Sequence, residues 1–75
     1  MSEPREEIMS FALAMERKME EHDKTRGDSW KEMSTDWLLG RTFEELGEYL
    51  EDNWNSGELV DAANFLMFVW SIHNR

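Results

Sequence analysis

The sequence contains no cysteine, one proline and four glycines in 75 residues. The absence of cysteine excludes disulfide bonds, and the low content of proline and glycine favours long helices. A chain of this length buries only about 60% of the surface that it exposes when unfolded, so the core of a monomer is small. We therefore expect a bound metal or a second subunit to supply additional stability.

Positive charge is also scarce, since eight Lys and Arg stand against 17 Asp and Glu, for a formal net charge of −9. This charge argues against nucleic acid or an anionic membrane as the ligand, because both are polyanions. The longest apolar run, residues 65–70, is too short to span a bilayer, and MSEPREEI does not resemble a signal peptide. We expect a cytoplasmic protein whose ligand is a cation, a basic partner or a metal-bridged anion.

Three segments have the apolar periodicity of helices. The first, residues 2–24, is expected to begin with Ser2 as its N-cap and Pro4 in its first turn. The second has Ser34 or Thr35 as its N-cap and runs to about residue 52, and the third begins after Asn55 as its N-cap. The sequence therefore predicts an all-α fold.

The apolar residues of these helices predict that a single chain does not complete the fold. We expect the second helix to bury a stripe at helical spacing, formed by Leu39, Phe43, Leu46 and Leu50. The third helix is apolar around its whole circumference, and two other helices cannot cover it. The prediction is one domain over residues 1–75, with three helices per chain in an antiparallel bundle that a second subunit completes. We expect His22 and His73 to pack on apolar faces.

Acidic residues form two groups that an antiparallel packing of the second and third helices would bring together. Glu44, Glu45 and Glu48 lie within one arc of the second helix, and Glu58 and Asp61 share a face of the third. Facing carboxylates repel each other unless a divalent cation lies among them, and their oxygens suit Mg²⁺ or Mn²⁺. However, 12 of the 75 residues are Glu, and an EExxE pattern arises by chance in roughly one such chain in three.

Individual polar residues of the third helix have alternative roles. Glu58 suits a metal site and also a capping box with Asn55, and the two roles are compatible. Asp61 stands in an apolar run, where an ionised Asp is rarely buried unless it is paired or binds a metal. Asn64 either forms a hydrogen bond across the bundle or contacts a substrate.

The two acidic groups, EELGE at 44–48 and ELVD at 58–61, resemble the EExxE and ExxD signature of the all-α nucleoside triphosphate pyrophosphohydrolases, the MazG-like superfamily. DAANF at 61–65 is similar to the D-x-A-N-F run of small, often phage-borne members. The resemblance extends from about residue 15 to residue 70. It implies a single MazG-like helical domain, a homodimer or homotetramer, that hydrolyses a nucleoside triphosphate to the monophosphate and pyrophosphate.

The resemblance also implies roles for the acidic residues. The residues that would bind Mg²⁺ are Glu45, Glu48, Glu58 and Asp61. Glu44 would either help to bind a second ion or orient the attacking water, so Glu44, Glu45 and Glu48 are the candidate catalytic residues. The metal would neutralise the triphosphate, which explains how an acidic protein binds a polyanion.

Substrate contacts are expected around a loop at residues 25–30. Lys24, Arg26 and Lys31 flank or lie in this region, where they would bind phosphate oxygens or else pair with neighbouring acids. Trp30 would either stack on a base or pack in the core.

A different class of function suits the charge equally well. A small acidic helical protein without catalytic activity could bind a partner, as an inhibitor that mimics the charge of DNA does. Such a mimic distributes its acids over an outer surface, whereas Asp61 and Asn64 stand within an apolar helix. A family member that keeps the bundle and has lost activity is a third alternative.

Overall fold

The computed structural model describes residues 3–23, 29–52 and 54–74. They form three α-helices, α1 (Glu6–Asp23), α2 (Thr35–Glu51) and α3 (Ser56–His73), and a short 3₁₀ helix, η1 (Ser29–Glu32). No strand occurs in these ranges, so the predicted all-α fold with three α-helices is confirmed. None of the helices in the same ranges has the length and apolar content needed to cross a bilayer.

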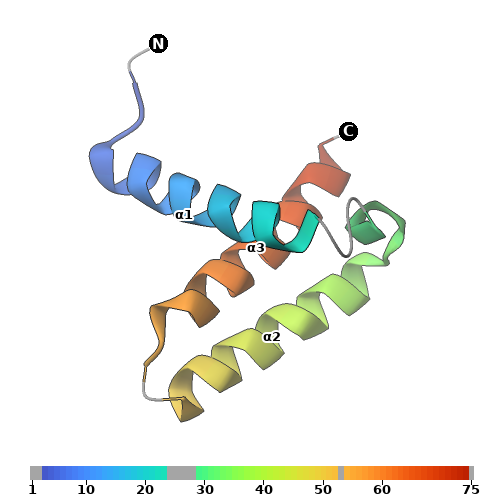
Figure 1. Cartoon of the computed structure of the whole chain (residues 1–75). Helices are drawn as coiled ribbons and strands as arrows, with labels where there is room; N and C mark the ends of the chain where they lie inside the picture. Colours follow the sequence, from blue (N-terminus) through green and yellow to red (C-terminus); the bar gives the residue numbers. More distant parts are fainter. Residues whose placement is uncertain (1–2, 24–28, 53, 75) are drawn as a thin grey trace.

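Helix α3 lies at the centre of the arrangement. It packs antiparallel against α2 along most of its length, and α1 crosses it (Figure 1). η1 lies between α1 and α2 in the chain and also contacts α3. The side of α3 that faces α2 and η1 therefore determines which side chains meet across the fold.

Of the two N-caps predicted for α2, Ser34 is the one observed, and the N-cap Asn55 predicted for α3 is confirmed. Ser34 Oγ accepts a hydrogen bond from the backbone N–H of Trp37 at 3.1 Å, and Asn55 Oδ1 accepts one from Gly57 at 2.9 Å. Each cap satisfies a backbone donor that the first turn of a helix leaves unpaired. These caps fix the start of both helices that carry the acidic groups.

Helix α1 begins later than the sequence predicts. The backbone N–H of Met9 donates to the carbonyl of Arg5 at 3.0 Å, so Arg5 is at the N-cap position and Pro4 precedes the helix. Proline is compatible both with the first turn of a helix and with the residue before the N-cap, because a backbone N–H at either position forms no hydrogen bond within the helix. The predicted cap Ser2 and the predicted end Lys24 lie outside the described residues.

The prediction of a loop at residues 25–30 is wrong where it can be compared with the structure. Ser29 and Trp30 belong to η1, and the backbone N–H of Met33 donates to the carbonyl of Trp30 at 3.1 Å. A 3₁₀ turn this short has no apolar periodicity that a sequence pattern would reveal.

The core of the single chain is small and differs from the predicted one. Its buried hydrophobic residues are Leu38, Ala62 and Phe68, and its buried polar residues are Thr42, Glu45 and Asn64. Helix α2 therefore turns the face with Leu38, Thr42 and Glu45 towards α3. The face of α2 that packs on α3 therefore buries one leucine and two polar residues.

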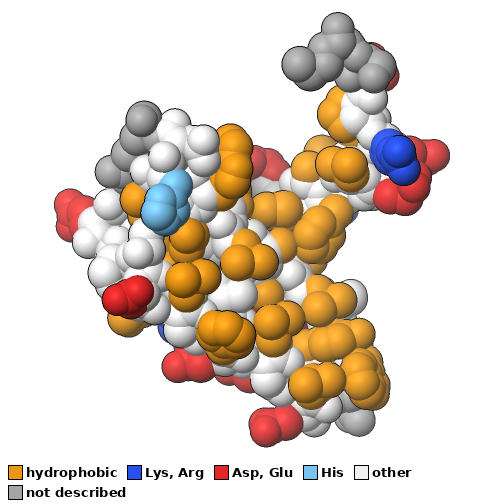
Figure 2. Space-filling model, turned by 180° about the vertical axis from the view of Figure 1, so that it is seen from behind, with side chains coloured by type: hydrophobic (Ala, Val, Ile, Leu, Met, Phe, Trp, Pro, Cys, Tyr) orange, Lys and Arg blue, Asp and Glu red, His pale blue; other side chains and the backbone are white. Residues whose placement is uncertain are grey.

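The predicted core stripe of α2 is exposed in the single chain. Its members are 37% to 73% exposed: Leu39, Phe43, Leu46 and Leu50. The stripe lies about 100° around the helix from the face that packs on α3, so a single neighbouring helix covers only one of the two. Leu66 and Trp70 of α3 are exposed too, and Figure 2 shows hydrophobic side chains gathered over one face of the molecule.

The two histidines also differ from their predicted packing positions. His22, near the end of α1, and His73, the last residue of α3, are both exposed. Both stand at the end of a helix, where a neighbouring helix covers less of the surface. A histidine in the last turn also complements the helix dipole.

Candidate functional site

Three carboxylates from two helices meet where α2 packs against α3. Glu45 and Glu48 lie one turn apart on α2, and Glu58 lies in the first turn of α3. One ligand oxygen from each residue lies within 4.8 Å of those of the other two. Oxygens that bind one Mg²⁺ at about 2.1 Å lie about 3–4 Å apart, so a small contraction would bring all three to one ion. We call these three residues the carboxylate cluster.

Glu45 is the buried member of the carboxylate cluster, with 5% of its surface exposed. Burial raises its pKa to about 8, and the neighbouring Glu58, Glu48 and Asp61 contribute to the rise. A divalent cation bound at this carboxyl group would favour its ionised form. The donor set and its burial therefore fit a divalent metal ion.

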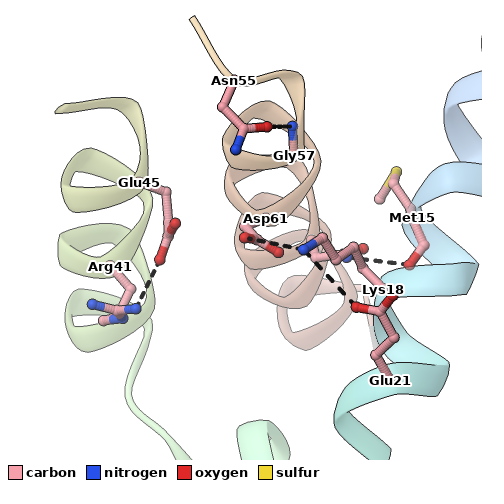
Figure 3. Close-up of polar contacts among 9 residues, drawn as sticks. Met15, Lys18, Glu21, Arg41, Glu45, Asn55, Gly57 and Asp61 are labelled. Atoms are coloured by element: carbon pink, nitrogen blue, oxygen red, sulfur yellow. Dashed lines mark hydrogen bonds and ion pairs between the residues drawn. The ribbon is translucent and has the colours of Figure 1, made fainter. Parts of the chain in front are cut away.

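Arg41 supplies one positive charge to this region. It lies one turn before Glu45 on α2, and its Nη2 donates to Glu45 Oε1 at 2.7 Å (Figure 3). Its Nη1 donates to Glu44, and its guanidinium carbon lies 5.4 Å from the centre of the Phe65 ring. Arg41 favours the ionised form of Glu45, whereas burial and three neighbouring acids favour the protonated form. The pKa of Glu45 is raised because the second group of effects is larger.

The raised pKa of Glu45 predicts that the metal-free protein loses stability as the pH rises. The folded pKa of about 8 exceeds the ordinary value of 4.5, so between these values the folded chain holds a proton that the unfolded chain has released. This contribution to the free energy of unfolding is complete below pH 4.5 and is lost up to about pH 8. We expect a loss of a few kcal/mol in urea unfolding curves recorded with a chelator.

Glu45→Gln is the matched variant for the pH dependence, because the amide keeps the size of the side chain and cannot titrate. Its unfolding free energy should change less between about pH 5 and pH 8 than that of the wild type. An identical pH dependence in both proteins would rule out Glu45 as the source.

Asp61 lies beside the carboxylate cluster, one turn beyond Glu58 on α3. Its Oδ2 is 4.0 Å from Nζ of Lys18 on α1, which also pairs with Glu21 at 3.9 Å (Figure 3). Asp61 and Glu45 line the same pocket, and the charge of Asp61 raises the pKa of Glu45. The structure thus places all four predicted metal ligands in one region, three of them within the cluster.

Glu44 is separated from the other four acids. Its side chain is 60% exposed and pairs with Arg41. Consecutive residues of a helix point about 100° apart, so Glu44 turns to the side when Glu45 faces α3. Among the predicted catalytic residues, Glu44 is the one that the structure does not bring to the carboxylate cluster.

A pocket of about 620 Å³ adjoins the carboxylate cluster. This volume lies within the range of about 300–1,000 Å³ that is common for sites of small ligands. Glu45, Asp61 and Arg41 are charged residues of its lining. Its aromatic lining comes from η1, α2 and α3: Trp30, Trp37, Phe65 and Phe68. The pocket therefore combines charged groups with aromatic rings.

Trp30 packs within the aromatic wall. Its ring stacks on Phe68, with ring centres 4.4 Å apart and an angle of 9° between the planes. Nζ of Lys31 lies 5.7 Å from the centre of the same ring. Phe65 meets both Phe68 and Trp37 edge to face. The packing role proposed for Trp30 is observed, and the ring also belongs to the pocket.

Asn64 connects α3 to α1. Its Nδ2 donates to the carbonyl of Met15 at 3.2 Å, which is the predicted hydrogen bond across the bundle. This bond leaves Oδ1 as an acceptor, and Oδ1 is buried without a hydrogen-bond partner, as is Nε1 of Trp30. Both residues line the pocket, although these two atoms are themselves buried.

The remaining predicted contacts are only partly placed. Lys24 and Arg26 lie outside the described residues. The carboxylate of Glu58 lies with those of Glu45 and Glu48. This position is compatible with the predicted metal role of Glu58, which stays a prediction.

The pocket residues that were not predicted as site residues include Trp37, Arg41, Phe65 and Phe68. The spacing of Arg41 from Glu44 and Glu45, three and four residues, is the spacing of helical ion pairs and would have predicted its partners. Trp37 lies one turn before Arg41 on the same face of α2, which would have placed it beside the same site.

Comparison with known proteins adds one relative. No family model matches the chain, and no solved structure matches it significantly. An uncharacterized protein from Archaeoglobus fulgidus is 40% identical over 47 residues, which cover 55% of this chain and 50% of the relative. The chain spans about half the length of this relative.

Proposed function

We propose that the protein is a Mg²⁺-dependent nucleoside triphosphate pyrophosphohydrolase of the MazG-like type. The observation that carries the proposal is the carboxylate cluster, in which Glu45 and Glu48 of α2 meet Glu58 of α3 beside a pocket with an aromatic wall. A triphosphate needs cations at its oxygens, and a nucleobase needs apolar surface. The cluster and the pocket offer both in adjacent positions.

Glu45, Glu48 and Glu58 would hold Mg²⁺, or Mn²⁺ in its place, and Asp61 would complete the set from the pocket. The bound ion would neutralise phosphate charge and make a bound water a better nucleophile. In the reaction, the water oxygen forms a bond to the α-phosphorus while the bond from that phosphorus to the bridging oxygen breaks. The nucleoside monophosphate and pyrophosphate are the products, and a carboxylate of the site accepts the proton of the water.

The aromatic residues would bind the nucleoside. Trp30 is held by Phe68, and Trp37 is partly exposed at the same pocket. Stacking on such rings is favourable for every base, so it supplies affinity without choosing the base. Asn64 lines the same pocket, but its Oδ1 and Nε1 of Trp30 are buried, so a base or sugar would bond to them only after a local rearrangement.

Binding of the metal can be tested through the melting temperature. Mg²⁺ at about 100 times its dissociation constant stabilises the folded state by about 2.7 kcal/mol, which corresponds to roughly 10 °C or more in a domain of this size. We expect this rise with Mg²⁺ and not with Na⁺ at matched ionic strength. Asp61→Asn should reduce the rise, and an unchanged response would exclude Asp61 from the metal site.

We also propose that two or more copies assemble, as a homodimer or homotetramer. A compact protein of 9.0 kDa exposes about 4,900 Å², whereas this chain exposes 5963 Å². Two separate chains would expose about 3,900 Å² more than a compact particle of twice the mass, which is the size of an obligate interface. The exposed stripe of α2, with Leu66 and Trp70 of α3, supplies the apolar surface.

Phe43→Glu tests the assembly, because Phe43 is 73% exposed and lies at the middle of the α2 stripe. Light scattering of the wild type at micromolar concentration should give at least twice 9.0 kDa, and the variant should shift towards the mass of one chain. Phe43→Leu keeps an apolar side chain and should retain the assembly. A wild type that is a stable monomer would exclude this part of the proposal.

A further inference from the structure

Arg41 is a charged pocket residue that hydrolysis as proposed above does not use. Among the described residues that line the pocket, it is the one Lys or Arg. Its side chain is 31% exposed, and its two terminal nitrogens bond to two different carboxylates of its own helix, Glu44 and Glu45. A guanidinium that neutralises neighbouring acids on a surface would not need to line a pocket or to lie over an aromatic ring.

The contact with Glu45 conflicts with metal binding at the same carboxyl group. Nη2 of Arg41 is 2.7 Å from Oε1 of Glu45, and an oxygen of Glu45 is also part of the carboxylate cluster. A divalent ion bound by that carboxylate and the guanidinium would then be close neighbours. Two positive charges at short range repel each other, and solvent screens the repulsion only in part. Arg41 therefore competes with the cation unless an anion joins them.

The surroundings of Arg41 allow it to leave Glu45 and stay in the pocket. The Phe65 ring lies 5.4 Å from the guanidinium carbon, and Glu44 binds the other terminal nitrogen. An aromatic ring attracts a cation that lies over its face, whichever acceptors the cation is hydrogen-bonded to. The guanidinium fork also matches two oxygens of a phosphate, as it matches those of a carboxylate.

We propose that Arg41 exchanges partners in this site: it neutralises Glu45 while no divalent cation is bound, and it binds a phosphate of the ligand once a cation occupies the carboxylate cluster. The proposal rests on the proposed function, because it needs a metal at Glu45. It assigns to Arg41 two opposite effects, since the same side chain weakens binding of the bare cation and strengthens binding of the anion that follows.

The test measures these two effects separately with Mn²⁺ and inorganic tripolyphosphate as probes. Free Mn²⁺ is followed by electron paramagnetic resonance, and tripolyphosphate binding is followed by calorimetry in saturating Mn²⁺. For Arg41→Gln we expect Mn²⁺ to bind about three- to tenfold more tightly, because a competing charge is gone. Tripolyphosphate should bind about tenfold more weakly, because a bidentate partner is lost.

Two further variants make the result specific. Arg17→Gln removes the same charge from an exposed position of α1, and neither affinity should change appreciably. Arg41→Lys keeps the charge without the fork, so tripolyphosphate should bind more weakly while Mn²⁺ binds nearly as in the wild type. This second variant also serves if circular dichroism shows that Arg41→Gln does not fold.

The outcomes separate this proposal from the proposed function. If the wild type binds no Mn²⁺, both are overturned. If it binds Mn²⁺ and Arg41→Gln binds it equally or more weakly, the exchange is overturned and the metal site stands. Tighter Mn²⁺ binding with weaker tripolyphosphate binding in the same variant supports the exchange.

Discussion

Glu48→Gln should lower Mg²⁺-dependent pyrophosphate release by about 10³-fold, since a metal ion contributes several kcal/mol to the transition state and each 1.36 kcal/mol is a factor of ten. Glu48 belongs to the carboxylate cluster and is its exposed member. The amide keeps the helix propensity and the size of the side chain but removes the charge that holds the cation. The fold should persist, because one of the repelling charges is gone. Pyrophosphate release from deoxynucleoside triphosphates measures the effect.

Glu16→Gln is the matched control for this variant. Glu16 is exposed on α1, and its replacement makes the same change in charge. Its activity should stay close to that of the wild type. Equal rates for the wild type and Glu48→Gln would remove Glu48 from the catalytic site and would favour the alternative of an acidic partner-binding protein.

Trp30→Ala should destabilise the protein by about 3–5 kcal/mol, the usual cost of truncating a packed aromatic residue. Trp30 stacks on Phe68, and Phe68 is one of the few buried hydrophobic residues of the chain. A domain of this size has little stability to lose, so we expect much of the variant to be unfolded at 25 °C. Urea unfolding measures the loss. Trp54→Ala is the control, because Trp54 is exposed and has an edge-to-face contact with Tyr49.

Trp30→Phe separates packing from substrate binding at the same position. Phenylalanine keeps a ring against Phe68, so most of the stability should remain. It removes Nε1, which is buried and has no hydrogen-bond partner among the described residues, and it offers less surface to a base. If Trp30 contacts the nucleoside, KM should rise while the fold survives. An unchanged KM would leave Trp30 with its packing role alone.

Local signals in the sequence predicted the start of two helices well. Ser34 and Asn55 are caps because their side chains satisfy backbone N–H groups that no other part of the chain reaches. Such effects depend on neighbours in sequence and need no tertiary structure. The start of α1 was less predictable, since Pro4 suits both a first turn and the residue before a cap.

The face of α2 that packs on α3 could not be predicted from periodicity. Leu39 and Phe43 belong to an apolar stripe that has the spacing of a core face, yet the face that packs carries Leu38, Thr42 and Glu45. Periodicity shows which residues share a face, and it does not show whether that face meets its own chain or a second one. The buried face includes Glu45 of the carboxylate cluster.

The sequence predicted the acidic residues of the site better than it predicted the other residues. The spacings within residues 44–48 and 58–61 placed the carboxylates on facing arcs, and the short turn between α2 and α3 brings three of them together. The separation of Glu44 from Glu45 depends on the rotation of α2 about its axis, which packing decides. The sequence alone does not show that Arg41 belongs to the site, because its contact with Phe65 and its place in the pocket depend on the tertiary structure.

We propose that this chain cleaves nucleoside triphosphates between the α and β phosphates with a divalent cation. The most direct measurement separates the products of a panel of ribo- and deoxyribonucleoside triphosphates, incubated with the purified protein and either Mg²⁺ or a chelator. We expect monophosphate and pyrophosphate in equal amounts with Mg²⁺, no orthophosphate, and no reaction with the chelator. Orthophosphate with diphosphate would mean a different bond is cleaved, and no metal-dependent product from any nucleotide would mean that the protein is not this enzyme.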